Sequence, residues 1–265
     1  YGATQTVGPG TYNDITFTGT GGYSVNSDVV VNNELLITNG ALTVQDGVSV
    51  TVTDVITVNT PGTFILENNA SLVQINDVTN VGRITYKRNT TPMNNFDYTY
   101  WSSPVSGQTL YNLSPNTLSD KYHSFTDPDW IDELGSNPMI AGKGYAIRTP
   151  KAGTWPNGEV VSFPYTQKVK FIGVPNNGDY TYIGISNNKS YLLGNPYPSA
   201  IDADAFLNEN HLILDGTIYF WTHNTGIAPS GAFYVYNDND YASYNLTGGT
   251  GTTAAATSIS AKRTG

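Results

Sequence analysis

The segment Asn237-Asp238-Asn239-Asp240 places four oxygen-bearing side chains in a row, directly after an apolar segment. Alternate oxygens from such a loop suit Ca²⁺, a hard cation that binds roughly six to eight oxygen ligands. The candidate metal ligands are Asn237, Asp238 and Asp240. The same residues also suit a hairpin turn, in which Asn and Asp side chains bond to their own backbone. The turn is the favoured interpretation, and Ca²⁺ is the one cofactor that the sequence leaves open.

Four tryptophans and nineteen tyrosines offer a second kind of chemistry, the stacking of an aromatic ring on a sugar. Trp101 and Trp221 lie in apolar strand-like segments, so we expect them to be core residues. Trp130 lies in Asp-Pro-Asp-Trp-Ile-Asp and Trp155 in Gly-Thr-Trp-Pro-Asn-Gly, which are loop-like segments where the rings are expected to be exposed. Trp130 and Trp155 are therefore the candidate ligand-binding residues, with a glycan as the ligand.

The sequence contains none of the common catalytic signatures. It has no Gly-x-Ser-x-Gly elbow, no His-Glu-x-x-His motif and no dinucleotide-binding fingerprint. His123, His211 and His223 do not have the spacing of metal ligands. A pair of carboxylates for glycoside hydrolysis could always be chosen from so many Asp and Glu residues, so that possibility has no weight of its own. We therefore expect no catalytic residues and no enzyme.

The elements that position these residues begin with a run of short strands between Val29 and Ile75. Apolar residues alternate there and are separated by Asn, Gly, Thr, Asp and Pro, which is typical of strands joined by turns. The strand starts are roughly six to eight residues apart, and three strands make a coil of about twenty residues. We predict a short right-handed parallel β-helix. The alternating groups are Val29/Val31, Leu35/Ile37, Leu42/Val44, Val48/Val50/Val52, Ile56/Val58 and Phe64/Leu66. The corner residues expected to adopt left-handed backbone are Asn32, Asn33, Asn39, Asn68 and Asn69.

The chain changes character near Arg83, because no Lys or Arg precedes this residue and every Trp and His follows it. We predict two domains: a β-solenoid over residues 1–88 and an antiparallel β-sandwich or jelly roll over residues 89–265, incomplete at its C-terminus. The second domain is expected to cover the open end of the last coil, because solenoids need caps. Its predicted segments include a strand from Tyr180 and a short helix with Ser199 as a candidate N-cap.

Charge and composition exclude some partners. The net charge is −9 and the sequence pI is about 4.6, which argues against binding to nucleic acid or to an anionic membrane. No apolar run has the length of a membrane span, so we expect no membrane insertion. Cysteine is absent, which does not decide the compartment, because a large β protein can fold without disulfides.

The segment Tyr191-Leu-Leu-Gly-Asn-Pro-Tyr-Pro-Ser-Ala-Ile-Asp-Ala-Asp-Ala-Phe resembles one found in large secreted surface proteins of Flavobacterium-like Bacteroidota. The matching blocks lie within roughly residues 64 to 245 and follow the order of that family. The resemblance implies export by the type 9 secretion machinery, an extracellular or outer cell-surface location, and an adhesin-like or gliding-associated role. Members of that family continue further, so we expect this chain to be a fragment. The other blocks are Tyr98-Thr-Tyr-Trp-Ser-Ser-Pro-Val, Ala141-Gly-Lys-Gly-Tyr, Gly173-Val-Pro-Asn-Asn-Gly-Asp-Tyr and Ile218-Tyr-Phe-Trp-Thr-His-Asn.

Three functions follow from these observations. The preferred one is a non-catalytic cell-surface or secreted module, adhesin-like or structural, whose partners are surface glycans or other surface proteins. A stalk or exported cargo without a small ligand is the second. The third is a polysaccharide-active enzyme or its accessory domain, because long β-helices host such enzymes. The absence of Lys and Arg before Arg83 argues against the third.

Overall fold

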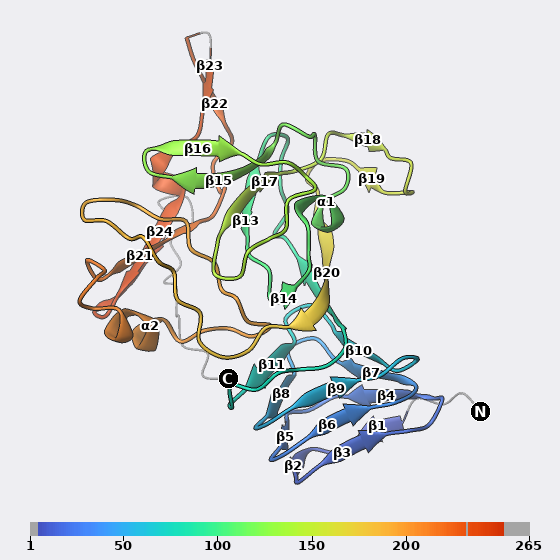
Figure 1. The fold of residues 1–265 in the computed structure, drawn as a ribbon. Helices are drawn as coiled ribbons and strands as arrows, with labels where there is room; N and C mark the ends of the chain where they lie inside the picture. Colours follow the sequence, from blue (N-terminus) through green and yellow to red (C-terminus); the bar gives the residue numbers. More distant parts are fainter. Residues whose placement is uncertain (1–4, 232, 252–265) are drawn as a thin grey trace.

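A computed structural model describes residues 5–231 and 233–251 of the chain. The fold is nearly all β, with 41% strand and 6% helix. A parallel β-solenoid of about 4 turns forms the first part, and antiparallel sheets form the second (Figure 1). The predicted fold class, a solenoid followed by antiparallel β-structure, is confirmed.

Each of the first three turns of the solenoid contributes one strand to each of three sheets, in which the solenoid strands are parallel to one another. Tyr23, Leu42, Phe64 and Ile84 pair in successive turns and lie about twenty residues apart. The first sheet contains β1 (Gln5–Val7), β4 (Gly22–Val25), β7 (Ala41–Val44) and β10 (Thr63–Leu66). The second contains β2 (Gly10–Tyr12), β5 (Val29–Val31), β8 (Ser49–Val52) and β11 (Ser71–Gln74). The third contains β3 (Ile15–Phe17), β6 (Leu35–Ile37) and β9 (Ile56–Val58).

The solenoid core consists of the alternating residues that the sequence indicates. Every member of the six predicted groups is buried, whereas the intervening Val30 is 36% exposed. Val25, Val44, Leu66 and Tyr86 pair with one another across consecutive turns and form one column of this core. Each buried aliphatic side chain of such a column contributes about 1.5–3 kcal/mol, so the columns stabilise the stack of turns.

The corner asparagines mostly do not behave as predicted. Asn69 has a φ of 60°, but the other four have no positive φ, so the expectation of left-handed backbone is wrong for them. Glycines take several of the positive-φ positions in the solenoid instead. Asparagine side chains connect successive turns: Asn33 donates to Asp14 at 2.7 Å, and Asn68 accepts from the backbone N–H of Asn89 at 2.8 Å.

One sheet continues from the solenoid into the second part. β12 (Ile84–Asn89) pairs in parallel with β10 and antiparallel with β20 (Lys168–Pro175), which also pairs with β14 (Val105–Ser106). The predicted domain boundary, between residues 88 and 89, therefore falls inside β12. Core residues of both parts belong to one hydrophobic cluster, which extends from Phe17 to Phe171.

The second part covers the C-terminal end of the coil stack, as expected. The backbone N–H of Leu72, on the outer edge of β11, donates to the carbonyl of Pro198 at 2.8 Å. The side chain of Asn177 donates to the carbonyls of Asn76 and Val78, at 2.6 and 3.0 Å. These contacts satisfy backbone groups that the next turn of a longer solenoid would otherwise bond.

The central sheet of the second part has the strand order β13-β17-β15-β16 and is antiparallel throughout. One of its faces carries the buried residues Tyr122, Tyr145 and Ile147 toward the main core. Its strands are β13 (Tyr98–Trp101), β17 (Tyr145–Arg148), β15 (Tyr122–Thr126) and β16 (Asp129–Asp132). Beside this sheet lie the short helix α1 (Leu110–Leu113) and the hairpin of β18 (Gly153–Thr154) and β19 (Val160–Val161).

The last segment, which we call the C-terminal lobe, packs a helix on a small sheet. Its core contains Ala203, Leu207 and Tyr244. The elements are α2 (Ala203–Glu209), β21 (Thr217–Trp221), β24 (Tyr241–Asn245) and β25 (Gly248–Thr250), with the hairpin β22 (Ala228–Ser230) and β23 (Phe233–Val235) and the 3-10 turn η1 (Asp238–Asp240).

Two local predictions before and within this lobe are wrong. No strand forms over residues 180–185, although the apolar alternation there suggested one. The N-cap of α2 is Asp202, whose carboxylate accepts from the backbone N–H of Ala205 at 3.0 Å, and not Ser199. Among the described residues, no helix has the length and apolar character needed to cross a membrane.

Candidate functional site

The second face of the central sheet carries a row of aromatic rings. Because side chains alternate along a strand, Tyr98 and Tyr100 on β13 lie on one face, opposite to that of the buried Tyr122. Phe125 on β15 pairs with Trp130 on β16, with their ring centroids 5.1 Å apart. The ring of Tyr100 lies 5.9 Å from that of Trp130. We call Tyr98, Tyr100, Phe125 and Trp130 the aromatic face.

The C-terminal lobe covers one part of the aromatic face. Trp221 stacks on Tyr100 at 6.0 Å, and its indole N–H donates to the carbonyl of Tyr98 at 2.9 Å. The hydroxyl groups of Tyr100 and Tyr241 are hydrogen-bonded at 2.6 Å. Burial and this hydrogen bond raise the pKa of Tyr100 far above its ordinary value, so the hydroxyl remains neutral. These contacts fix the rings that support Trp130.

Trp130 lies at the uncovered rim of the aromatic face. Its side chain is 46% exposed, although Phe125 and Tyr100 contact it from the sheet. Asp132 is two residues further along β16 and therefore on the same face, about 7 Å away along the strand. Its carboxylate side chain is 82% exposed and lies 2.9 Å from Nδ1 of His123. The rim thus combines a supported indole ring with an accessible hydrogen-bond acceptor.

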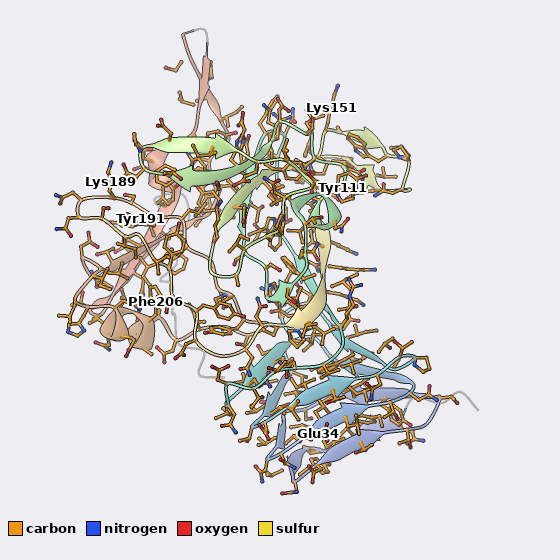
Figure 2. The ribbon with its side chains drawn as sticks, viewed as in Figure 1. Glu34, Tyr111, Lys151, Lys189, Tyr191 and Phe206 are labelled. Carbon is orange, nitrogen blue, oxygen red and sulfur yellow. The ribbon has the colours of Figure 1, made fainter. Side chains whose placement is uncertain are left out.

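Trp155 lies on a different element, at the hairpin of β18 and β19. Its ring is half-buried, and its indole N–H donates to the carbonyl of Lys151 at 3.0 Å. Lys151 and this hairpin project on the right of the view, whereas β16 lies toward the left (Figures 1 and 2). Trp130 and Trp155 therefore do not form one platform, and within the described part of the chain no other ring packs on Trp155.

In the acidic turn before β24, one side-chain oxygen of Asn237 and one of Asp240 accept hydrogen bonds within the protein. The side chain of Asn237 accepts from the backbone N–H of Asn239 at 2.9 Å and caps η1, which is the predicted turn geometry. Asp238 is exposed, whereas Asp240 is fully buried and accepts from the backbone N–H of Thr225 at 3.0 Å. The three candidate ligands are thus divided between surface and interior. Over the residues described, no three His, Cys, Asp or Glu side chains converge as a metal site would require.

Asp240 instead belongs to a buried polar contact between the C-terminal lobe and the rest of the second part. Asp97 is 2% exposed, and its carboxylate accepts from the backbone N–H of Asn94 at 2.6 Å. Nδ1 of His223 lies 3.7 Å from the Asp97 carboxylate. Burial raises the pKa of Asp97, and the negative charge of Asp240 adds to that increase. This cluster is enclosed, so we assign it a structural role in holding the lobe.

The sequence predicted an exposed Trp130 in a loop; the residue is exposed, but it lies on strand β16, so the loop prediction is wrong. The rings that support Trp130 were not predicted. The sequence did indicate that Tyr98 and Tyr100 lie on the same face, because residues two apart on a strand share a face. The contact of Tyr241 with Tyr100 had no such signal, because it joins residues 141 positions apart in the chain. Trp221, expected in the core, covers these rings from the lobe and is only partly buried.

Comparison with known proteins gives a family and no activity. No curated protein matches the chain, and no solved structure matches it. The family described as "Domain of unknown function (DUF8693)" matches residues 5–264, which include both the solenoid and the antiparallel sheets. The chain therefore belongs to the DUF8693 family.

Proposed function

We propose that this protein is a non-catalytic module of the cell surface or of secreted proteins, and that it binds glycans at the rim around Trp130. The observation that carries the proposal is the 46% exposure of a tryptophan whose ring is held in place by two further rings. A large exposed aromatic side chain that is fixed before binding loses little conformational entropy when a ligand stacks on it.

The chemistry of the rim suits a sugar. The apolar C–H face of a pyranose can pack on the indole, while its hydroxyl groups donate to an acceptor beside the ring. Asp132 supplies that acceptor on the same face of β16. The open rim favours a chain of sugars lying along the surface over a small molecule enclosed in a deep pocket.

The cellular part of the proposal is supported by the resemblance to large secreted surface proteins of Bacteroidota. On this proposal the type 9 secretion machinery exports the parent protein, and the module acts outside the outer membrane. The solenoid then serves as a rigid spacer that presents the second part. The solenoid has acidic residues and no Lys or Arg before Arg83, so like-charge repulsion separates it from other acidic surfaces.

A glycan array probed with the full chain tests the binding proposal. We expect Trp130→Ala to weaken binding about 10- to 30-fold, which corresponds to about 1.4–2 kcal/mol. Trp130→Phe should retain part of the affinity. Tyr219→Ala is the matched control, because Tyr219 is also an exposed ring on a strand of the second part, at 62% exposure.

Three results would contradict the proposal. Arrays without any signal would favour a structural stalk that has no small ligand. Equal binding by Trp130→Ala and wild type would show that the rim around Trp130 is not the binding site. Release of reducing sugar from a bound polysaccharide would show that the protein is an enzyme, which is the alternative function given by the sequence analysis.

A further inference from the structure

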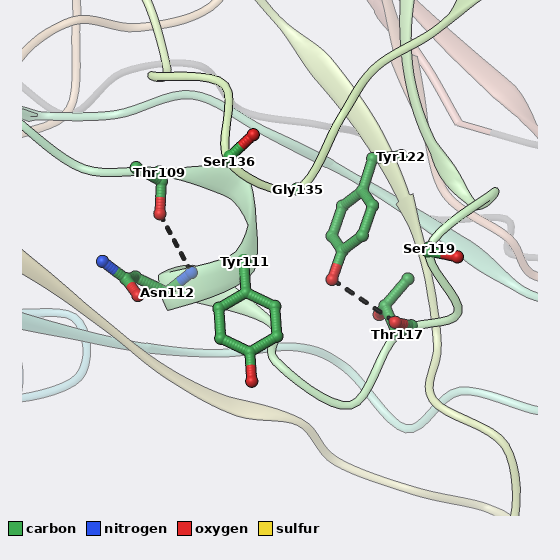
Figure 3. A pocket seen from close by; sticks show the side chains of 8 residues that line it. All are labelled: Thr109, Tyr111, Asn112, Thr117, Ser119, Tyr122, Gly135 and Ser136. Atoms are coloured by element: carbon green, nitrogen blue, oxygen red, sulfur yellow. Dashed lines mark hydrogen bonds between the residues drawn. The ribbon is translucent and has the colours of Figure 1, made fainter.

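A groove lies beside α1, on the side of the central sheet opposite to the aromatic face. It is open to solvent and has a volume of about 570 Å³ between α1, the strand start at Tyr122 and the turn at Gly135 (Figure 3). This volume lies within the range of roughly 300–1,000 Å³ that small-ligand sites have. Tyr111 lies at its wall and is 55% exposed, whereas Tyr122 is buried beneath it. We call it the Tyr111 groove.

The Tyr111 groove has no charged lining residue, and most of its exposed surface is apolar, with hydroxyl and amide groups contributing a smaller part. Its lining is made of Tyr, Thr, Ser, Asn and Gly only. Asn112, Ser119 and Ser136 are exposed, and their side chains make no hydrogen bond to any other described residue. Burial raises the pKa of the Tyr122 hydroxyl to about 12, so this group also stays neutral. A charged ligand would lose hydration here without gaining a charged partner.

Core packing and hydrogen bonds hold the elements of the groove together without a ligand. Leu110 and Leu113 anchor α1 in the main core, which leaves Tyr111 and Asn112 on its outer side. The backbone N–H of Tyr111 donates to the carbonyl of Gly135 at 2.8 Å. A Cβ atom at Gly135 would lie 3.2 Å from the Cβ of Tyr111, so the turn packs closely against α1. The floor is fixed by Tyr122, whose hydroxyl donates to the carbonyl of Ser114 at 2.6 Å.

We infer that the Tyr111 groove is a second binding site, and that its ligands are neutral sugars. The exposed ring of Tyr111 offers a stacking surface, and the unpaired hydroxyl and amide groups of Ser119, Ser136 and Asn112 can bond sugar hydroxyls. The proposed site at Trp130 is on the other face of the same sheet, because Tyr122 and Phe125 point to opposite faces of β15. One chain would therefore hold two sugar segments at once, which would make it a cross-linker of neutral polysaccharide.

The experiment uses the full chain and neutral oligosaccharides of glucose and of N-acetylglucosamine, six units long, observed by saturation-transfer NMR. The variants are Trp130→Ala, Tyr111→Ala and the double variant, with Tyr219→Ala as the exposed-tyrosine control. We expect Trp130→Ala to retain saturation transfer to at least one oligosaccharide. In the Trp130→Ala background, Tyr111→Ala should weaken that binding at least tenfold, and Asn112→Ala should weaken it severalfold.

The results separate this inference from the function proposed above. If Trp130→Ala retains binding that Tyr111→Ala removes, the groove is a site whether or not the rim binds. If Trp130→Ala abolishes all binding, the groove is not a site and the proposal for the rim still holds. If no oligosaccharide binds the wild type, or if Tyr111→Ala in the Trp130→Ala background changes nothing, the inference is overturned. A charged control, oligogalacturonate, should show no transfer that depends on Tyr111.

Discussion

Asn80 connects the end of the solenoid with the part of the chain that covers it. Its side-chain oxygen accepts from the backbone N–H of Ile56 on β9 at 3.0 Å. Its side-chain nitrogen donates to the carbonyl of Pro175 at the end of β20, at 3.2 Å. The amide also pairs with Gln74 through two hydrogen bonds of 2.8 Å. Asn80 itself is 8% exposed, so water does not compete freely for these groups.

The substitution Asn80→Ala removes all of these bonds together. It leaves the N–H of Ile56 and the carbonyl of Pro175 buried without this partner, and each such group costs about 1–3 kcal/mol. Gln74 keeps a hydrogen bond to the carbonyl of Asp54, which limits its own loss. We therefore expect the free energy of unfolding to fall by about 2–4 kcal/mol. With an m-value of about 3 kcal/mol/M, the urea midpoint falls by roughly 1 M.

Equilibrium urea denaturation checks this value with two probes. All four tryptophans lie beyond residue 100, so their fluorescence reports on the second part alone, whereas far-UV circular dichroism reports on both parts. Because one core and one sheet join the two parts, we expect both transitions of Asn80→Ala to shift together. Asn32→Ala is the control, since Asn32 is an exposed corner asparagine, and it should change stability by less than about 0.5 kcal/mol.

Two results would refute the reasoning about the cap. A urea midpoint of Asn80→Ala that equals that of wild type within error would mean that the hydrogen bonds of Asn80 do not stabilise the contact between the two parts. A shift of the circular dichroism transition with an unchanged fluorescence transition would mean that the solenoid unfolds independently of the second part.

The remaining predictions concern the backbone, pH and metal. Gly82→Ala should destabilise the protein by more than about 3 kcal/mol, because a Cβ there would lie 1.9 Å from the carbonyl oxygen of Val58. Gly47 has a similar φ but no atom near its Cβ position, so the control Gly47→Ala should cost only about 1–2 kcal/mol. Thermal denaturation of both variants measures the difference. Burial raises the pKa of Asp97 in the folded protein, so protonation of this carboxyl stabilises the folded state at low pH, and that stabilisation is lost as pH rises above about 4. The free energy of unfolding of Asp97→Asn should therefore increase relative to that of wild type as pH rises. A difference that stays constant with pH would contradict this. Calorimetry should give equal melting temperatures in Ca²⁺ and in EDTA, because exposed Asp238 and buried Asp240 do not converge and one oxygen each of Asn237 and Asp240 bonds within the protein. A rise of several degrees in Ca²⁺ would support the metal interpretation instead.

The fold of the first part could be predicted because its information is local. Alternation of apolar residues over short segments decides which side chains point inward, and regular spacing decides where the chain turns. Val29 and Val31 are buried, and Val30 between them is exposed, for this reason. The same local signal failed at residues 180–185, where alternation is present but the segment forms no strand. A strand needs a free edge to pair with, and that depends on the remainder of the fold.

The sequence by itself therefore determined the β-solenoid, the antiparallel second part and the exposure of Trp130. The tertiary structure decided which groups meet: Tyr100 with Tyr241, Asn80 with Pro175, and Tyr111 with the turn at Gly135. These contacts join residues far apart in the chain, and nothing in either local segment specifies its partner. Binding sites made from such contacts arise only when the packing of the sheets brings the segments together, which is why the Tyr111 groove had no signature in the sequence.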